Sequence, residues 1–211
     1  QLGGDNSTAP GRTLKEPRFG DGRGHLRVKI LVDDDEPTIR KRWEPRIRKR
    51  VGAVSDILKQ TCNLQLDVVA VGEWKSHDQL HDVDLLLQEF RKLVDPSPAD
   101  LAIGFSSGAD NSDRRIHLGG SPGLLQQHIL VREWSSGMSE AERTEILLHE
   151  IGHYLGAVHS PDPNSVMRPL LGDQKARSPD FPIRFDPVNT LILNLIAEEF
   201  RQNELTAPDD L

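Results

Sequence analysis

Residues 149–159 constrain this chain more than any other stretch, because they place three histidines and a glutamate at fixed spacings. His149 and His153 are four residues apart, Glu150 follows the first of them, and His159 comes six residues after the second. Two histidines four apart on an α-helix lie about 40° apart around its axis and one turn apart along it. Both imidazoles can therefore reach one metal ion, with Glu150 on the same turn.

A third histidine on the same helix would converge less well on that ion, so the chain has to leave the helix before His159. Gly156 suits this turn, because glycine readily adopts the positive φ with which helices commonly end. The segment fits the elongated zinc-binding pattern H-E-x-x-H-x-x-G-x-x-H, which this composition produces by chance in about one chain in ten thousand. We predict that His149, His153 and His159 bind one Zn²⁺ and that Glu150 is the general base.

The residues on either side of this segment predict its local structure. Ser139 begins a helix that runs to about Leu155, because Glu142 lies three residues later and the two can form a reciprocal capping box. Residues 156–185 are rich in Pro, Asp and Ser and have no helical or strand period. An irregular stretch of this length is uncommon unless it belongs to a site.

The remaining chain alternates between strand and helix patterns. Apolar residues at every second position, or in short Val- and Leu-rich runs, predict strands at 25–32, 64–71, 101–105, 114–118 and 128–134. Apolar residues at helical spacing predict helices at 45–61, 80–94 and 186–200. Pro45 suits the first turn of the first of these, and Asp186-Pro187 forms a good N-cap and N1 pair for the last. The pattern predicts a domain of the α/β (α+β) class.

Seven basic residues lie close together just before and within the first turns of the helix predicted at 45–61. They are Arg40, Lys41, Arg42, Arg46, Arg48, Lys49 and Arg50. Most of them fall opposite the apolar residues of that helix, so a solvated face is the favoured interpretation and a docking patch for an acidic partner is the alternative. The net charge of -7 argues against a nucleic-acid surface. No apolar run approaches the roughly 20 residues that cross a bilayer.

A chain of 211 residues is long enough for one domain with a proper core. We expect that domain at 25–205, between an N-terminal tail at 1–24 and a C-terminal tail at 206–211. The chain begins at Gln1 without a signal-peptide pattern, as a processed or trimmed chain does. Cys62 is the one cysteine, so no internal disulfide can form, and we expect it to be a small buried apolar residue.

The chain resembles the metzincin clan of zinc metalloproteases, and is closest to its matrixin and adamalysin branches. Besides the zinc pattern, Ser165-Val166-Met167 is similar to the methionine-containing turn that these proteins have after the third histidine. Ser160 and the eight-residue step from His159 to Met167 resemble the matrixins. The likeness covers about residues 25–205. It departs from the family in having no cysteine switch and no disulfide cysteines.

This resemblance implies a five-stranded mixed sheet with three main helices and an active-site cleft between upper and lower subdomains. It also implies a secreted or extracytoplasmic, monomeric zinc endopeptidase with one catalytic ion, and Met167 as an apolar floor beneath the imidazoles. An extended peptide substrate would pair with an edge strand near 114–120. Its side chain after the scissile bond would enter a pocket for which Leu170, Leu171 and Phe181 are candidate lining residues.

The sequence also offers a candidate for a second metal site and leaves two alternative functions. His77 and His81 stand four apart beside acidic residues, but a solvent-facing helix start is favoured over a second metal pair. The loops around 110–113, His117 and His128 do not resemble the structural metal sites of matrixins, so no further metal is expected. The alternative functions are a non-catalytic zinc-binding module, against which Glu150 argues, and a zinc hydrolase of a non-protein amide, which stays open.

Overall fold

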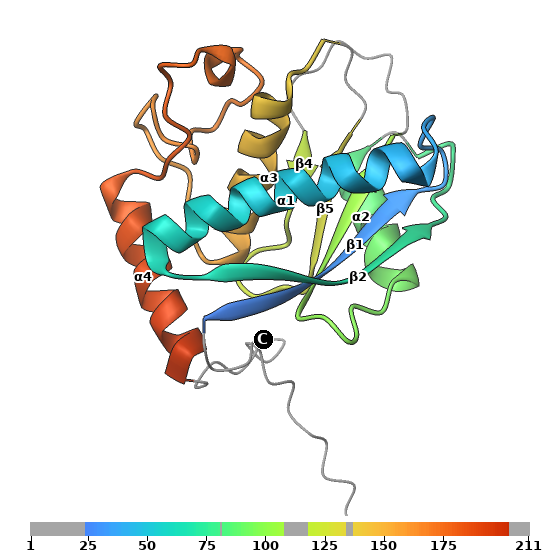
Figure 1. Ribbon diagram of the computed structural model, residues 1–211, viewed down its shortest axis with the longest axis horizontal. Helices are drawn as coiled ribbons and strands as arrows, with labels where there is room; N and C mark the ends of the chain where they lie inside the picture. The colour runs from blue at the N-terminus through green and yellow to red at the C-terminus, as the bar shows by residue number, and fades with distance from the viewer. Residues whose placement is uncertain (1–23, 81, 108–117, 134–136, 203–211) are drawn as a thin grey trace, which may run out of the picture.

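The computed structural model describes residues 24–80, 82–107, 118–133 and 137–202, which form five strands and four α-helices (Figure 1). Except for Gly24, the expected tails lie outside these residues, so the domain boundaries stay predictions. Among the described residues, no helix is both long and apolar enough to cross a membrane.

The strands form one sheet whose order differs from their order in the chain. From edge to edge they are β2 (Gln65–Trp74), β1 (His25–Asp33), β3 (Leu101–Ser106), β5 (His128–Arg132) and β4 (Gly119–Gly120). The first four run parallel and β4 runs antiparallel to β5. This confirms the predicted five-stranded mixed sheet. Every residue of β3 is buried, as expected for a central strand that is covered on both faces.

Helices cover the two faces of this sheet unequally. The helices are α1 (Arg40–Cys62), α2 (Val83–Leu93), α3 (Glu140–Tyr154) and α4 (Pro187–Gln202), with a 3-10 turn at Lys175–Arg177. The larger core lies between the sheet and α1, α3 and α4, and a smaller one lies between the sheet and α2. In β1, Val28 and Ile30 belong to the first core and Leu31 to the second. The alternation read from the sequence thus separates the two layers.

The helix predicted from Pro45 begins five residues earlier, at Arg40, so placing Pro45 in its first turn was wrong. The apolar face extends upstream of the proline, because Trp43 is buried together with Ile47. Pro45 itself is exposed, so its ring is directed away from the core. Glu44 binds Arg40 and Arg48 one turn to either side, which supports the helix around the proline.

The basic stretch is not simply a solvated face. Lys41, Arg42, Arg48 and Lys49 are exposed, as expected. The Arg50 side chain, however, is fully buried and bonds Glu133 after β5 and Glu140 at the start of α3. Here the interpretation was wrong, because Arg50 lies on the apolar side of the helix, where two carboxylates compensate its charge.

The other elements differ little from expectation. The capping box forms as predicted, with Ser139 Oγ accepting from Glu142 N at 3.3 Å and Glu142 Oε2 accepting from Ser139 N at 2.8 Å. Helix α2 begins at Val83 instead of Leu80, because the Asp82 carboxylate caps it there. Cys62 is buried, as predicted.

Two predictions concern residues that lie largely outside the part of the chain that the structure describes. Most of the expected edge strand 114–118 lies there, and β4 follows directly after it. His77 is exposed in the loop before α2, and its expected companion His81 lies outside the described residues. The exposed position of His77 agrees with the solvent-facing interpretation.

Asp186 caps α4, and removing its carboxylate should weaken the domain in a pH-dependent way. Asp186 Oδ1 accepts from Val188 N at 3.1 Å and Asn189 N at 3.2 Å. Burial raises the pKa of Asp186, but hydrogen bonds from Asn189, Ser165 and Ser160 outweigh this and lower the pKa to about 2 from its usual 3.8. The stabilisation is therefore complete above the higher value and is lost as the pH falls through the lower one.

We expect Asp186→Ala to lower the free energy of unfolding by about 0.5–2 kcal/mol at neutral pH, the range for loss of an N-cap. Urea denaturation of both proteins at a series of pH values measures this difference, which should shrink between about pH 4 and pH 2. A difference that stays constant over that range would show that the Asp186 charge contributes nothing.

Candidate metal centre

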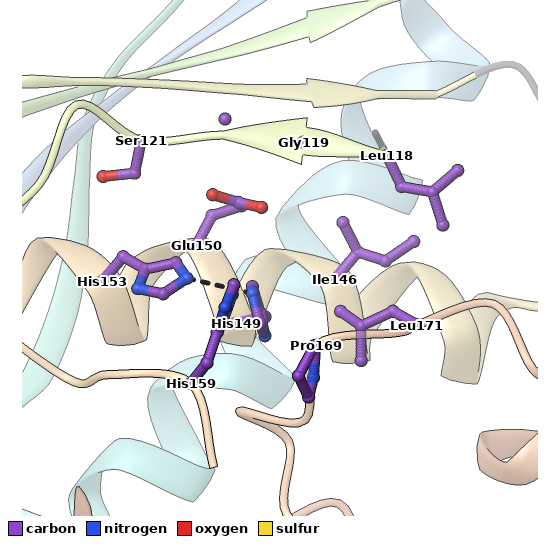
Figure 2. Close-up of a pocket in the computed structure, with 11 residues that line it drawn as sticks. Leu118, Gly119, Ser121, Ile146, His149, Glu150, His153, His159, Pro169 and Leu171 are labelled. Atoms are coloured by element: carbon purple, nitrogen blue, oxygen red, sulfur yellow. Dashed lines mark hydrogen bonds between the residues drawn. The ribbon is translucent and has the colours of Figure 1, made fainter. Parts of the chain in front are cut away.

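Helix α3 carries the first two of the three predicted metal ligands, and the chain after it returns the third. The ligand nitrogens of His149, His153 and His159 all lie within 4.8 Å of one another. The ring centroids of His149 and His153 are 4.6 Å apart. The ring centroid of His159 lies 5.4 Å from that of His149 and 5.0 Å from that of His153 (Figure 2). Among the described residues, no other group of His, Cys, Asp or Glu side chains converges in this way.

Backbone carbonyls orient the first two imidazoles. His149 Nδ1 lies 2.8 Å from the Val166 carbonyl oxygen, and His153 Nδ1 lies 2.9 Å from that of Ala157. A carbonyl only accepts hydrogen bonds, so each Nδ1 carries the proton and each Nε2 presents a lone pair. The two Nε2 atoms lie 3.0 Å apart. The dashed line in Figure 2 joins these two imidazoles.

The turn that brings His159 back begins at Gly156, which has the positive φ, +83°, that the sequence predicted. Hydrogen bonds hold the backbone on both sides of His159. Asn189 of α4 bonds both the N–H and the carbonyl of Val158, and Ser160 N donates to the Met167 carbonyl at 2.8 Å. The third imidazole is thus placed by α4 and the methionine turn, although it lies outside the metal-binding helix.

Met167 lies against the turn of α3 that separates the two helical histidines. It is fully buried, and a Cβ added at Gly152 would be 2.7 Å from its sulfur and 3.0 Å from a Phe185 ring carbon. Glycine at 152 therefore permits this approach. Met167 thus packs against the ligand helix, and its role as an apolar floor beneath the imidazoles stays a prediction.

Gly152→Ala tests this contact. The new methyl group would overlap the Met167 sulfur and crowd the Phe185 ring, so these side chains or the turn have to shift, at a cost of about 1–3 kcal/mol of stability. Gly52→Ala on α1 is the matched control, because a Cβ there meets nothing within 4 Å. Alanine should stabilise that helix by up to about 1 kcal/mol. Thermal unfolding measures both changes, and equal stability of the two variants would contradict the contact.

The electrostatic environment favours neutral imidazoles. Burial, together with the neighbouring His153 and His159, lowers the pKa of His149 to about 4, and burial also lowers the pKa of His153. Both rings are therefore uncharged at neutral pH, the form that binds a metal. Burial raises the pKa of Glu150 to about 8. A cation held by the histidines would oppose this by favouring the carboxylate.

The histidines open into a cavity of about 340 Å³ that lies between α3, β4 and the loop after Met167 (Figure 2). Its lining comprises Leu118, Gly119, Gly120, Ser121, Ile146, His149, Glu150, His153, His159, Pro169 and Leu171. Of the three lining residues proposed from the sequence, Leu171 is present. Leu170 is 66% exposed, and Phe181 packs instead against the Arg168 guanidinium.

The donor set fits zinc. Two nitrogens at about 2.0–2.1 Å from one tetrahedral zinc ion lie about 3.3 Å apart, close to the 3.0 Å between the His149 and His153 Nε2 atoms. Three imidazole ligands leave a fourth position, as in catalytic rather than structural zinc sites. The open cavity beside Glu150 provides room for it.

Three residues that shape this site were not predicted individually from the sequence, although Gly119 lies within the edge strand expected near 114–120. Asn189 holds the backbone at Val158, and Arg168 bonds Glu145 and Asp173 behind the cavity. Gly119 of β4 lies so close to Glu150 that an added Cβ would be 2.8 Å from its Oε1. The position of Asn189, three residues after the N-cap Asp186, was a local signal. No local signal marks the other two.

Comparisons with known proteins agree with this geometry. The family model described as matrixin matches residues 70–189, which include all three histidines and the methionine turn. The archaemetzincin of Methanopyrus kandleri has a similar fold, with a TM-score of 0.59 and 17% identity over 82% of this chain and 96% of that one.

A chain in the structure of a chaperone–substrate complex gives a TM-score of 0.52 and 13% identity, over 86% of this chain but only 39% of that one. At 17% and 13% identity, both matches show a similarity of fold alone. A comparison with curated protein sequences finds no match.

Proposed function

Since the chain belongs to the matrixin family of zinc metallopeptidases, we propose that it is a zinc-dependent endopeptidase with Glu150 as its general base. His149, His153 and His159 bind one catalytic Zn²⁺. One observation carries the proposal: three imidazoles with converging ligand nitrogens and one buried carboxyl group line the same cavity. A purely structural zinc site would have no use for the carboxyl group or for the open side.

When bound, zinc lowers the pKa of a water molecule beside it to about 7 and polarises a peptide carbonyl. The chain's own residues supply the proton transfers. Glu150 accepts the proton of the attacking water on its carboxylate and delivers it to the leaving amine. Figure 2 shows the Glu150 carboxylate between α3 and the Gly119–Ser121 stretch, on the side of the cavity where substrate would lie.

The substrate is an extended peptide that pairs with β4. Within the part of the chain that the structure describes, this strand ends the sheet and only β5 pairs with it. Backbone pairing with an edge strand holds a peptide straight and is independent of its sequence. Gly119 and Gly120 have no side chains, which allows a close approach to the catalytic carboxylate.

The apolar part of the cavity receives the side chain that follows the scissile bond. Leu118, Ile146, Pro169 and Leu171 form that part. An aliphatic side chain of the substrate would bury its surface there, at about 25 cal/mol per Å² of apolar area.

Removal and return of zinc test the proposal. We expect the zinc-loaded chain to cleave an unfolded protein, chelation to abolish cleavage, and stoichiometric zinc to restore it. Mass spectrometry of the products maps the cut sites, which should precede aliphatic residues. The chain prepared without zinc is the control.

Two results would contradict the endopeptidase. One zinc bound per chain without cleavage of any protein or peptide would favour the non-catalytic binding module. Cleavage confined to a non-protein amide would favour the alternative hydrolase. We also propose, from the family, an extracytoplasmic monomer whose domain spans 25–205. Localisation of the tagged full-length protein and its mass in solution test these two properties.

A further inference from the structure

Arg168, which follows the methionine turn directly, is a buried charged side chain outside the metal centre. It is 4% exposed. Its Nη1 donates to Glu145 Oε1 at 2.6 Å and to the Ser165 carbonyl at 3.1 Å. Its Nη2 and Nε donate to the Asp173 carboxylate at 2.8 Å and 3.2 Å, and its guanidinium lies 5.2 Å from the Phe181 ring centroid. Together these contacts hold the planar guanidinium in one orientation.

The contact with Glu145 connects the loop to the metal-binding helix. Glu145 lies four residues before His149 on α3, one helical turn away, and is itself fully buried. Any movement of Arg168 relative to α3 would separate two buried opposite charges, which is costly. The start of the loop is therefore held in a fixed position relative to the first zinc ligand.

The contact with Asp173 joins the two ends of the loop. Arg168 and Asp173 are the first and last residues of a six-residue segment that contains Pro169 and Leu171, two residues of the cavity wall. Within it, Gly172 has a φ of +70°, and a Cβ there would be 3.0 Å from Leu118 Cδ1 on the facing wall. The loop thus lies close to Leu118 on the opposite side of the apolar part of the cavity.

We infer that Arg168 is a positioning residue for substrate selectivity: by binding Glu145 and Asp173 it fixes the width of the apolar pocket between Leu118, Ile146 and Leu171. This inference rests on the proposed function, because it concerns which side chain that site accepts. The arginine itself lies outside the cavity lining. It acts through the loop wall.

The test measures pocket selectivity by binding, with cleavage as a second measurement. The probes are two peptide hydroxamates that differ only in an isobutyl or a methyl side chain beside the zinc-binding group. Titration calorimetry on the zinc-loaded full chain gives their affinity ratio. For the wild type we expect the isobutyl compound to bind at least about tenfold more tightly, and for Arg168→Met we expect that preference to be largely lost.

Two further variants separate the pocket wall from general damage. Arg177→Met is the matched control, because Arg177 also binds a carboxylate of α3, Glu142, but lies 42% exposed and outside the cavity lining. It should keep the wild-type ratio. Arg168→Lys retains the charge but cannot hold Asp173 through two parallel hydrogen bonds while it also binds Glu145, so it should restore the preference only in part.

An unchanged ratio in Arg168→Met, with one zinc bound, would overturn the inference. If Arg168→Met does not fold, Asp173→Asn is the variant to compare, because Asp173 is 30% exposed and its loss opens only the loop end. A wild type that binds both hydroxamates with the expected preference but cleaves nothing would overturn the proposed function and leave the inference standing. Equal wild-type affinity for both compounds would overturn the inference even if proteins are cleaved.

Discussion

Glu150→Gln is expected to lower kcat/KM for a cleaved peptide at least about 100-fold while one zinc stays bound. General acid–base catalysis contributes about 10²–10⁴ in rate, and an amide can neither accept the water's proton nor deliver one to the leaving amine. Glutamine has nearly the same shape as glutamate. The close fit against Gly119 is therefore kept, and a loss of activity reports on the proton transfer.

The measurement is steady-state cleavage of one fluorogenic peptide, with bound zinc determined by atomic spectroscopy on the same samples. Glu142→Gln is the matched control, because Glu142 lies on the same helix but outside the cavity lining, where its carboxylate completes the capping box. That variant should lose some stability and keep its kcat/KM. If Glu150→Gln retained more than about a tenth of the wild-type activity, Glu150 would not be the base.

How much of this protein was predictable depends on how far apart in the chain the interacting residues lie. The metal-binding helix was predictable because the residues of its capping box, and its two histidines, are only three or four positions apart in the sequence. The third histidine was predictable because Gly156 marks the turn before it. The strands were predictable from alternating or continuous apolar runs, and the continuous run of β3 reflects a strand that is buried along its whole length. Their arrangement in one mixed sheet was predictable only through the family resemblance.

The buried ion pairs were not predictable for the same reason. Arg50 bonds Glu133 and Glu140, which follow it by 83 and 90 residues, and Arg168 bonds Glu145 across 23. The helical and strand periods of a sequence do not predict contacts between residues so far apart. From the local pattern, Arg50 could only be predicted to be exposed like the basic residues next to it. Pro45 was misplaced because the signal for a helix start was stronger than the contribution of Trp43 to the apolar face upstream.

The cluster around Arg50 connects the sheet to the start of the metal-binding helix. Its side chain is fully buried, and its Nη1 and Nη2 lie 2.5 Å and 3.1 Å from the two Glu133 oxygens. Glu133 follows β5 and is 4% exposed, while Glu140 opens α3 and is 57% exposed. The guanidinium lies 5.9 Å from the Phe105 ring centroid on β3. Arg50 thus holds α1, β3, β5 and α3 together.

Arg50→Met should therefore lower the free energy of unfolding by about 3 kcal/mol. Removing one partner of a buried ion pair costs about 3–5 kcal/mol, because the other charge stays buried. The lower end applies here, since Arg46 and Arg143 also lie 3.1 Å and 3.5 Å from Glu133 and compensate part of its charge. Methionine retains most of the aliphatic volume, so the change reports mainly on the charge. Urea denaturation measures it.

Two further variants decide whether the pairing itself is responsible. Arg48→Met, on the same helix but 45% exposed and paired with Glu44, should change stability by less than about 0.5 kcal/mol. Combining Arg50→Met with Glu133→Gln removes both members of the pair, so the double variant should be more stable than the sum of the two single losses predicts. Strict additivity would mean that Arg50 stabilises the domain through packing alone, and that the catalytic helix is held by its apolar contacts without this ion pair.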